Sequence, residues 1–256
     1  MDKIYKVALV TGASSGIGRA VAEKFAGEGY RLILLARRKE KLQELASNLK
    51  TKCHIIALDV REKDKLKEAF SNLPKEFSEI DILVNSAGGS LGLDSAQKAL
   101  WEDWEQMIET NCTALAYITH MLLPGMVARK KGHIVNLGSV AGDYAYPGGN
   151  VYGAAKSFVE HFSRNLKSDL IGTGVRVTNS EPGMVEPEFS LVRFKGDKEK
   201  AKNVYCGMTP LFPESIADAI LWSVTRPQNV NINRIEIMPE CQGPGPFAVI
   251  REQGKK

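Results

Sequence analysis

Cysteine is scarce in this chain of 256 residues, and its placement argues against two classes of protein. No two cysteines form a C-x-x-C pair, and no histidine stands at a spacing that would complete a zinc site. The four are Cys53, Cys112, Cys206 and Cys241. We therefore expect reduced thiols, with neither a disulfide framework nor a metal site.

The chain also lacks a long apolar run and a large excess of charge. No stretch approaches the roughly 20 apolar residues of a membrane-spanning helix, and residues 1–6 lack the apolar core of a signal peptide. The formal net charge is only +4, and the densest basic cluster, at 37–41, is balanced by Glu40 and Glu44. These features predict a cytoplasmic protein that binds neither a membrane nor nucleic acid.

What the sequence does contain is a regular alternation of two apolar patterns. Short apolar or β-branched runs predict strands at 7–10, 31–35, 53–58, 82–85, 133–137, 175–179 and 232–238. Helical spacing of apolar residues predicts helices at 19–27, 39–49, 63–72, 104–123, 151–171 and 215–224. Parallel strands need crossovers that cover both faces of a sheet. We therefore predict one α/β domain, 1–256, with a Rossmann-type doubly wound parallel sheet of about seven strands.

Residues 183–213 interrupt this alternation after the sixth predicted strand. The stretch contains Pro187, Gly196, Pro210 and Pro213. Ligands of doubly wound folds bind beyond the carboxyl ends of the strands, and long insertions there form lids and binding loops. We expect 183–213 to be a substrate-binding insertion.

A glycine-rich segment, TGASSGIG at 11–18, lies between the first predicted strand and the first predicted helix. Glycines at such a turn let the backbone approach a pyrophosphate, and the helix that follows offers unpaired N–H groups. The segment does not fit a phosphate-binding NTPase, because Gly18 is followed by Arg19 and Ala20 instead of Lys and Ser or Thr. It therefore predicts a dinucleotide site.

This turn fits the T-G-x-x-x-G-x-G motif, and the whole chain resembles the short-chain dehydrogenases, a family of nicotinamide-dependent oxidoreductases. Leu58-Asp59-Val60, Asn85-Ser86-Ala87-Gly88 and Pro182-Gly183 also match the family, although Ser86 replaces a second Asn. The resemblance implies cofactor contacts from Gly12, Ser14, Ser15, Gly16, Ile17, Gly18, Asp59, Val60, Asn85, Ala87, Gly88, Tyr152, Lys156, Pro182, Gly183 and Val185.

The end of the second predicted strand bears on the choice of cofactor. Family members that use NAD carry an acidic residue there, but this chain has Ala36 followed by Arg37 and Arg38. The two guanidinium groups can bind a 2′-phosphate with charge assistance, whereas a carboxylate would repel it. The alternative is a solvated helix start. We predict that Arg37 and Arg38 bind NADP.

A tyrosine and a lysine near the start of the predicted helix 151–171 are candidate catalytic residues. Tyr152 and Lys156 are four residues apart, so their side chains fall on one helix face. Ser139 follows the fifth predicted strand, and Asn111 lies in the predicted helix 104–123. Each residue alone is ordinary. Together they match the Asn-Ser-Tyr-Lys tetrad of the short-chain dehydrogenases.

The resemblance implies a role for each member of this tetrad. Tyr152 transfers the proton, and since a free phenol has a pKa of about 10, we expect the nearby Lys156 ammonium to lower it. Lys156 also holds the nicotinamide ribose. Ser139 donates a hydrogen bond to the substrate oxygen, and Asn111 positions a water behind Lys156.

Two other classes of function compete with this interpretation. Gly138-Ser139-Val140-Ala141-Gly142 suggests a serine hydrolase, but it lacks the G-x-S-x-G spacing, and the histidines show no triad order. A dinucleotide-binding regulator without activity would keep the glycine-rich turn. The presence of all four tetrad residue types favours an enzyme over such a regulator.

Within the family, the chain resembles the NADP-dependent 3-hydroxy acid dehydrogenases, which act on serine, allo-threonine and related acids, at 148–152, 188–194 and 230–233. A hydroxy acid needs a cation for its carboxylate, and Arg193 in the insertion is the candidate. Ser139, Tyr152 and Gly148 are the other expected substrate contacts. Alternatively, Arg193 points to solvent or pairs with Glu186 or Glu188, and a backbone amide of Gly148 or Gly149 receives the carboxylate. The alternative activity is that of a broad-specificity carbonyl reductase.

Family members of this size usually form tetramers through two long helices. The resemblance therefore implies a homotetramer that packs through the predicted helices 104–123 and 151–171. Their apolar content fits such an interface, but it would equally fit helices buried within a monomer.

Overall fold

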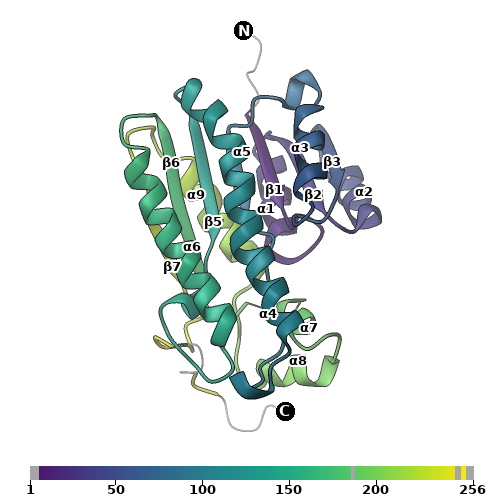
Figure 1. The fold of residues 1–256 in the computed structure, drawn as a ribbon, viewed down its shortest axis with the longest axis vertical. Helices are drawn as coiled ribbons and strands as arrows, with labels where there is room; N and C mark the ends of the chain where they lie inside the picture. Colours follow the sequence, from purple (N-terminus) through teal and green to yellow (C-terminus); the bar gives the residue numbers. More distant parts are fainter. Residues whose placement is uncertain (1–5, 186–187, 246–248, 252–256) are drawn as a thin grey trace.

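Seven parallel strands form the centre of the molecule in a computed structural model that describes residues 6–185, 188–245 and 249–251 (Figure 1). Their order across the sheet is β3-β2-β1-β4-β5-β6-β7. The strands are β1 (Val7–Thr11), β2 (Arg31–Ala36), β3 (Cys53–Ala57), β4 (Ile82–Asn85), β5 (Gly132–Leu137), β6 (Val175–Pro182) and β7 (Arg234–Ile237). All neighbouring strands pair in parallel, so the expected doubly wound fold is confirmed.

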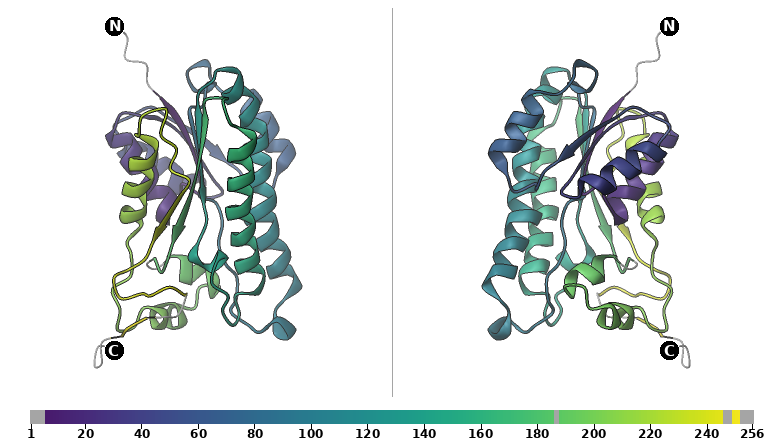
Figure 2. Two further views of the ribbon diagram at one scale, coloured as in Figure 1. Left: turned by 90° about the vertical axis from the view of Figure 1, so that its left-hand side faces the viewer. Right: turned by 90° about the vertical axis from the view of Figure 1, so that its right-hand side faces the viewer.

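Helices cover both faces of this sheet, as Figure 2 shows with the sheet on edge. One layer holds α1 (Gly16–Gly27), α2 (Lys39–Asn48) and α9 (Pro213–Val224), and the other holds α3 (Lys63–Ser71), α5 (Leu115–Ala128) and α6 (Asn150–Asp169). Successive strand residues point to opposite faces. Leu32 and Leu34 therefore join the core of the first layer, while Ile33 and Leu35 join that of the second.

One expected helix, 104–123, is divided in the structure. It consists of α4 (Trp101–Ile108), a π-helical segment η3 (Glu109–Ala114) and α5. A π turn takes in an extra residue, which an apolar pattern with a period of 3.6 does not reveal. The connections also contain three short 3₁₀ helices, η1 (Lys75–Phe77), η2 (Ala96–Lys98) and η4 (Val140–Gly142).

The expected insertion at 183–213 contains two short helices, α7 (Glu188–Arg193) and α8 (Lys198–Val204). Residues 186–187, and with them Pro187 and Glu186, lie outside the described part of the chain. Figure 1 shows α4, α7 and α8 at the same end of the molecule, beyond the carboxyl ends of the strands. Strand order reverses between β1 and β4, so the crevice in which doubly wound folds bind ligands opens toward these helices.

A chain of buried amides and hydroxyls joins the sheet to the second helical layer. Asn85 Nδ2 of β4 donates to Asn136 Oδ1 of β5 over 2.9 Å and to Thr119 Oγ1 of α5 over 3.0 Å. Asn136 Nδ2 donates in turn to Ser163 Oγ of α6 over 2.9 Å. Buried polar groups are costly unless they are paired, so these contacts fix both helices against the strands.

A buried histidine in β5 gives the sheet a pH-sensitive point. His133 is 2% exposed, and its Nε2 lies 2.8 Å from Thr178 Oγ1. Burial, followed by the charge of Arg176, lowers the pKa of His133 to about 3. The folded protein therefore keeps this imidazole neutral at pH values where an exposed histidine is protonated.

We expect His133 to lower the stability of the folded protein in mild acid. As the pH falls below about 6.5, the unfolded chain binds a proton at His133 and the folded chain does not. The stability that the neutral imidazole contributes is therefore complete above that pH and is lost as the pH falls toward 3. Between pH 7 and pH 5 it should lower the free energy of unfolding by about 2 kcal/mol. Urea titrations of His133→Asn should lack this part of the pH dependence. The exposed His120→Asn variant, as control, should keep it, and identical pH dependence in the two variants would contradict the assignment.

Candidate active site

The turn between β1 and α1 is shaped by its glycines. Gly12 has φ +67° and Gly16 has φ +51°, conformations that favour glycine. A Cβ on Gly12 would lie 3.0 Å from the Cα of Ala87, and one on Gly18 would overlap the Gly12 carbonyl. Ile17 packs its side chain into the first core. The turn thus has a bare backbone, and α1 begins without a side-chain cap, which suits a bound phosphate.

Thr11 fastens the end of β4 to this turn. Its Oγ1 accepts hydrogen bonds from Ser86 N over 3.0 Å and from Ala87 N over 2.8 Å. The side chain of Asn85 points instead to Asn136, inside the sheet. Of the expected cofactor contacts at 85–88, Asn85 therefore has only its backbone to offer, while Ala87 lies directly against the glycine turn.

The guanidinium of Arg38 lies over the same turn. Its Nη2 and Nε donate to Ser14 Oγ over 3.0 and 3.2 Å, and Nη2 also donates to Ser15 Oγ over 2.5 Å. Both serines were expected to contact the cofactor. The structure therefore brings a cation and hydroxyls together at the end of β2, where a solvated helix start was the alternative.

Asp59 follows β3 and is held by an arginine that sequence reasoning did not single out. Arg61 donates to both oxygens of Asp59, with Nε 3.1 Å and Nη2 2.9 Å away. Burial disfavours the carboxylate, but the hydrogen bonds and charge of Arg61 outweigh it, and the charge of Arg37 adds to them, so the pKa of Asp59 is lowered. Val60, which follows, is buried in the second core.

The end of β6 forms the opposite wall of the crevice. Pro182 is the last residue of the strand, and a Cβ on Gly183 would lie 2.5 Å from Gln242 Oε1, so a side chain there would displace Gln242. Val185 is held by its carbonyl, which accepts a hydrogen bond from Tyr205 over 2.7 Å. The three residues expected to border the nicotinamide thus lie in a fixed segment.

Tyr152 and Lys156 share the buried face of α6, and each is only 6% exposed. Lys156 Nζ lies 5.7 Å from the centroid of the Tyr152 ring and donates to the Leu137 carbonyl over 2.6 Å. The two polar heads converge at the end of β5. This is the arrangement that their spacing of four predicted.

Ser139 reaches the same place from the end of β5. Its Oγ accepts from Ala141 N over 3.1 Å and donates to the Pro182 carbonyl over 3.5 Å, and Ser139 lowers the pKa of the neighbouring Tyr152. Gly142 lets the segment that carries Ser139 come close to α6, because a Cβ on Gly142 would lie 2.9 Å from the Lys156 backbone. Ser157 Oγ then donates to the Gly142 carbonyl over 2.5 Å. The segment that carries Ser139 therefore packs directly on the helix that carries the Tyr–Lys pair.

Burial controls the electrostatics of this pair. It raises the pKa of Tyr152 to about 12, against the charge of Arg193 and the hydrogen bond from Ser139, which both lower it. Burial also lowers the pKa of Lys156 to about 8. Lys156 was expected to be the cation that lowers the phenol pKa. In the structure the cation that lowers the pKa of Tyr152 is Arg193, and the Lys156 ammonium donates to the Leu137 carbonyl.

Asn111 lies in the π-helical segment and holds a loop. Its Nδ2 donates to the carbonyls of Gly89 and Met107 over 2.9 and 2.8 Å, while its Oδ1 accepts from Gly89 N over 3.1 Å. A Cβ on Gly88 would lie 2.5 Å from that Oδ1. Asn111 thus fixes the 88–89 loop close to Lys156, and its expected contact with a water stays a prediction.

Arg193, at the end of α7, reaches into the site among aromatic rings. It is 8% exposed, and its Cζ lies 5.5 Å from the ring centroid of Tyr152, 4.9 Å from that of Phe189 and 5.9 Å from that of Tyr146. Nη2 donates to the Tyr146 hydroxyl over 2.9 Å. Nε has no hydrogen-bond partner within the described residues.

The structure bears on the alternatives for Arg193. The side chain does not point to solvent, and Glu188 pairs with Arg38 and Lys41. Gly148 lies beside this site with φ +76°, and its Cβ position is blocked by the Leu93 carbonyl. The amide of Gly149 already donates to Tyr146 O over 3.0 Å, so it is a poor receptor for a carboxylate. Sequence reasoning missed Tyr146 and Phe189, which no spacing pattern marks.

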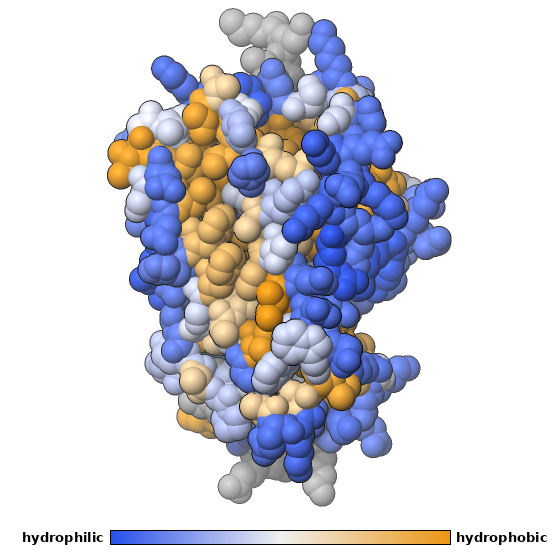
Figure 3. Space-filling view, viewed as in Figure 1, coloured by the Kyte–Doolittle hydropathy of each residue, from blue (hydrophilic) through white to orange (hydrophobic). Residues whose placement is uncertain are grey.

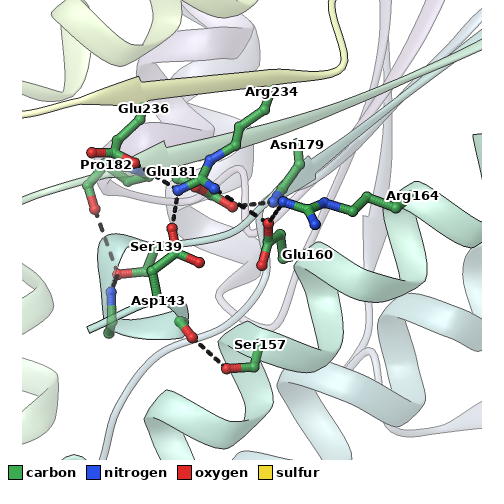
Figure 4. A network of polar contacts seen from close by, with 12 residues as sticks. Ser139, Asp143, Ser157, Glu160, Arg164, Asn179, Glu181, Pro182, Arg234 and Glu236 are labelled. Carbon is green, nitrogen blue, oxygen red and sulfur yellow. Dashed lines mark hydrogen bonds and ion pairs between the residues drawn. The ribbon is translucent and has the colours of Figure 1, made fainter. Parts of the chain in front are cut away.

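A second network supports the site from behind (Figure 4). Arg234 of β7 makes ion pairs with four carboxylates, which belong to Asp143, Glu160, Glu181 and Glu236. Glu181 is 1% exposed, and burial raises its pKa to about 7 although Arg234 opposes the rise. The oxygens of Asp143, Glu181 and Glu236 lie within 4.8 Å of one another, and the guanidinium already supplies a cation to them.

A dinucleotide crevice that ends at a buried tyrosine, lysine and serine defines an oxidoreductase that uses a nicotinamide cofactor. Residues 6–197 match the model of the family described as short chain dehydrogenase. The chain belongs to this short-chain dehydrogenase family.

Individual relatives agree with this assignment. The NADP-dependent 3-hydroxy acid dehydrogenase YdfG of Escherichia coli (strain K12) is 50% identical over 237 residues, which cover 92% of this chain and 96% of that protein. Serine 3-dehydrogenase of Agrobacterium fabrum is 47% identical over 244 residues, 95% and 98% of the two chains. The solved closed form of a serine dehydrogenase complexed with NADP+ has a TM-score of 0.92 and 49% identity, covering 96% of this chain and 100% of that one.

Removing the Tyr152 hydroxyl should separate binding from chemistry. Tyr152→Phe keeps the ring that contacts Phe189 but cannot transfer a proton, so we expect turnover to fall by roughly 10²-fold or more with nearly unchanged cofactor affinity. Steady-state kinetics and cofactor titration measure the two effects. Tyr117→Phe, which also removes a hydrogen-bonded hydroxyl but far from this site, should have normal turnover. Near-normal turnover of Tyr152→Phe would rule out Tyr152 as the proton-transfer residue.

Proposed function

We propose that the chain is an NADP-dependent oxidoreductase that acts on the hydroxyl-bearing carbon of small 3-hydroxy acids such as serine, allo-threonine or 3-hydroxypropionate. The observation that carries this proposal is Arg193, a buried guanidinium beside Tyr152 with an unpaired Nε. Relatives of about 50% identity that are named for the same substrates support it.

The residues at the carboxyl ends of the strands suit a dinucleotide. The glycine turn and the start of α1 would hold the pyrophosphate, Asp59 and Val60 would border the adenine, and the Pro182–Val185 segment would border the nicotinamide. Arg37 and Arg38 with Ser14 would bind a 2′-phosphate. When bound, the nicotinamide accepts the hydride in oxidation and returns it in reduction.

The side chains of this chain supply the proton chemistry. In oxidation the phenolate of Tyr152 takes the proton from the substrate hydroxyl, and in reduction the phenol gives it back, while Ser139 holds the substrate oxygen. Lys156 binds the ribose hydroxyls, and since its pKa is lowered to about 8 it can exchange a proton near neutral pH. Asn111 keeps the neighbouring loop in place and positions the water that relays this proton.

Arg193 provides the selectivity for acids. A cation in an apolar environment is costly unless an anion accompanies it, and no carboxylate among the described residues pairs with Arg193. A 3-hydroxy acid carries its carboxylate two bonds from the hydroxyl carbon. With the carboxylate on Arg193, and with Gly148 bordering the same space, that carbon would lie beside Tyr152.

Substrate selectivity tests this proposal. The wild-type enzyme should reduce NADP with serine, allo-threonine and 3-hydroxypropionate. Arg193→Met keeps much of the side-chain length without the charge, so we expect kcat/KM to fall by roughly 10-fold or more with these acids and to change little with an uncharged alcohol. Arg226→Met, remote on Trp222, is the matched control. Equal losses on charged and uncharged substrates would mean that Arg193 only folds the loop, and a wild-type preference for uncharged aldehydes or ketones would favour a carbonyl reductase.

Cofactor choice can be tested separately. Arg38→Ala removes charge-assisted contacts worth about 1.5 to 3 kcal/mol, so the Kd for NADP should rise by roughly one to two orders of magnitude while that for NAD changes little. Lys50→Ala, which removes an exposed charge at the far end of α2, should leave both constants unchanged. Calorimetric titration measures them, and a wild-type preference for NAD would refute the cofactor assignment.

We also propose that the enzyme is a cytoplasmic homotetramer. Figure 3 shows an apolar surface over α5 and α6, and on it Phe158 is 41% exposed and stacks on Phe162 with centroids 5.7 Å apart. Such a surface suits packing against another subunit. None of the helices in the described ranges is long and apolar enough to cross a membrane. A monomer in sedimentation equilibrium would contradict the assembly.

A further inference from the structure

Glu188, the first residue of α7, forms ion pairs with two cations near the end of β2. Its Oε1 is 3.8 Å from Arg38 Nη1 and 3.7 Å from Lys41 Nζ. Arg38 precedes α2, Lys41 belongs to it, and Glu188 comes from the insertion about 150 residues later in the chain. A carboxylate of the substrate-binding segment thus reaches the end of β2.

Arg38 belongs to the proposed 2′-phosphate site, and Lys41 lies beside it, because both cations are within 3.8 Å of the same carboxylate oxygen. Arg38 is anchored on Ser14, whose hydroxyl proton is left to bind a further acceptor. A phosphate and a carboxylate are both oxygen anions, and they cannot share these two cations without repulsion between like charges. Glu188 therefore has the chemistry and the position of an internal substitute for the phosphate.

We propose that Glu188 is a specificity-determining residue for the cofactor: it pairs with Arg38 and Lys41 in the cofactor-free enzyme, and the 2′-phosphate of NADP must displace it. NAD has no such phosphate and leaves the ion pairs intact. Glu188 therefore lowers the affinity for NADP and not that for NAD. This inference rests on the proposed NADP site.

The contacts of Glu188 are weak enough to be displaced. The side chains of Glu188 and Arg38 are 39% and 45% exposed, and ion pairs at such positions contribute little. The other carboxylate oxygen, Oε2, is buried and has no hydrogen-bond partner among the described residues. A phosphate, with up to two negative charges and three free oxygens, satisfies the guanidinium better than this carboxylate does.

Displacement of Glu188 acts on the helix that carries the substrate contact. Phe189, the next residue, packs on the Tyr152 ring with centroids 5.6 Å apart, and Arg193 ends the same helix. The six residues of α7 therefore connect the proposed 2′-phosphate site with the proposed site of the substrate carboxylate. When bound NADP displaces Glu188, the first residue of α7 is no longer paired with the cations near the end of β2.

Binding of nucleotide fragments to the enzyme tests this inference without catalysis. We would titrate wild type and Glu188→Gln with 2′,5′-ADP, 5′-AMP, NADP and NAD by calorimetry at low ionic strength. In Glu188→Gln the Kd for 2′,5′-ADP and NADP should fall by about two- to fivefold, the size of exposed ion pairs, while those for 5′-AMP and NAD stay unchanged. The gain should shrink in 0.5 M salt, because these pairs are screened.

A matched variant separates the local effect from a change in net charge. Glu199→Gln, in α8 of the same insertion, removes the same charge away from Arg38 and should bind all four ligands like wild type. An unchanged or weaker affinity of Glu188→Gln for 2′,5′-ADP, or an equal gain in Glu199→Gln, would overturn the role of Glu188. If wild type itself bound 2′,5′-ADP no better than 5′-AMP, the NADP assignment would fail as well, which distinguishes the two failures.

Discussion

The hydrogen-bonded chain from Asn85 through Asn136 to Ser163 is the interaction on which the rest of the site depends. It lies between the sheet and α6, out of contact with water, where unpaired amides would be costly. Ser163 belongs to the helix that carries Tyr152 and Lys156, so the chain fixes the position of both functional heads relative to the strand ends. The side chains of Tyr152 and Lys156 are therefore positioned by the rigid sheet and not by a loop.

Burial is the second constraint, and it acts on the tyrosine and the lysine in opposite senses. The same exclusion of water raises the pKa of Tyr152 and lowers that of Lys156, because it disfavours the charged form of each. The fold shifts the pKa of both groups from its ordinary value, and the charge of Arg193 opposes the rise in the pKa of Tyr152. Arg193 belongs to α7, so the insertion that we propose to select the substrate also lowers the pKa of Tyr152.

Much of this protein could be predicted from its sequence, since several signals are local. The apolar periods of strand and helix predicted the doubly wound sheet, the glycine turn lies where its neighbours in sequence place it, and the spacing of four put Tyr152 and Lys156 on one face. Ala36 followed by Arg37 and Arg38 likewise marked the end of β2 as basic. These features depend on residues within one or two turns of each other in the chain. Backbone geometry alone determines the relative positions of such residues.

The sequence by itself thus determined the strands of the sheet, the glycine turn and the helix face that Tyr152 and Lys156 share, while the tertiary structure decided what surrounds them. The aromatic rings around Arg193, the turn of Lys156 toward Leu137 and the approach of Glu188 to Arg38 all join segments far apart in the chain. No periodicity records such contacts. They arise because side chains from separate elements must fill one desolvated space, and its burial and charge exist only after those elements have packed together.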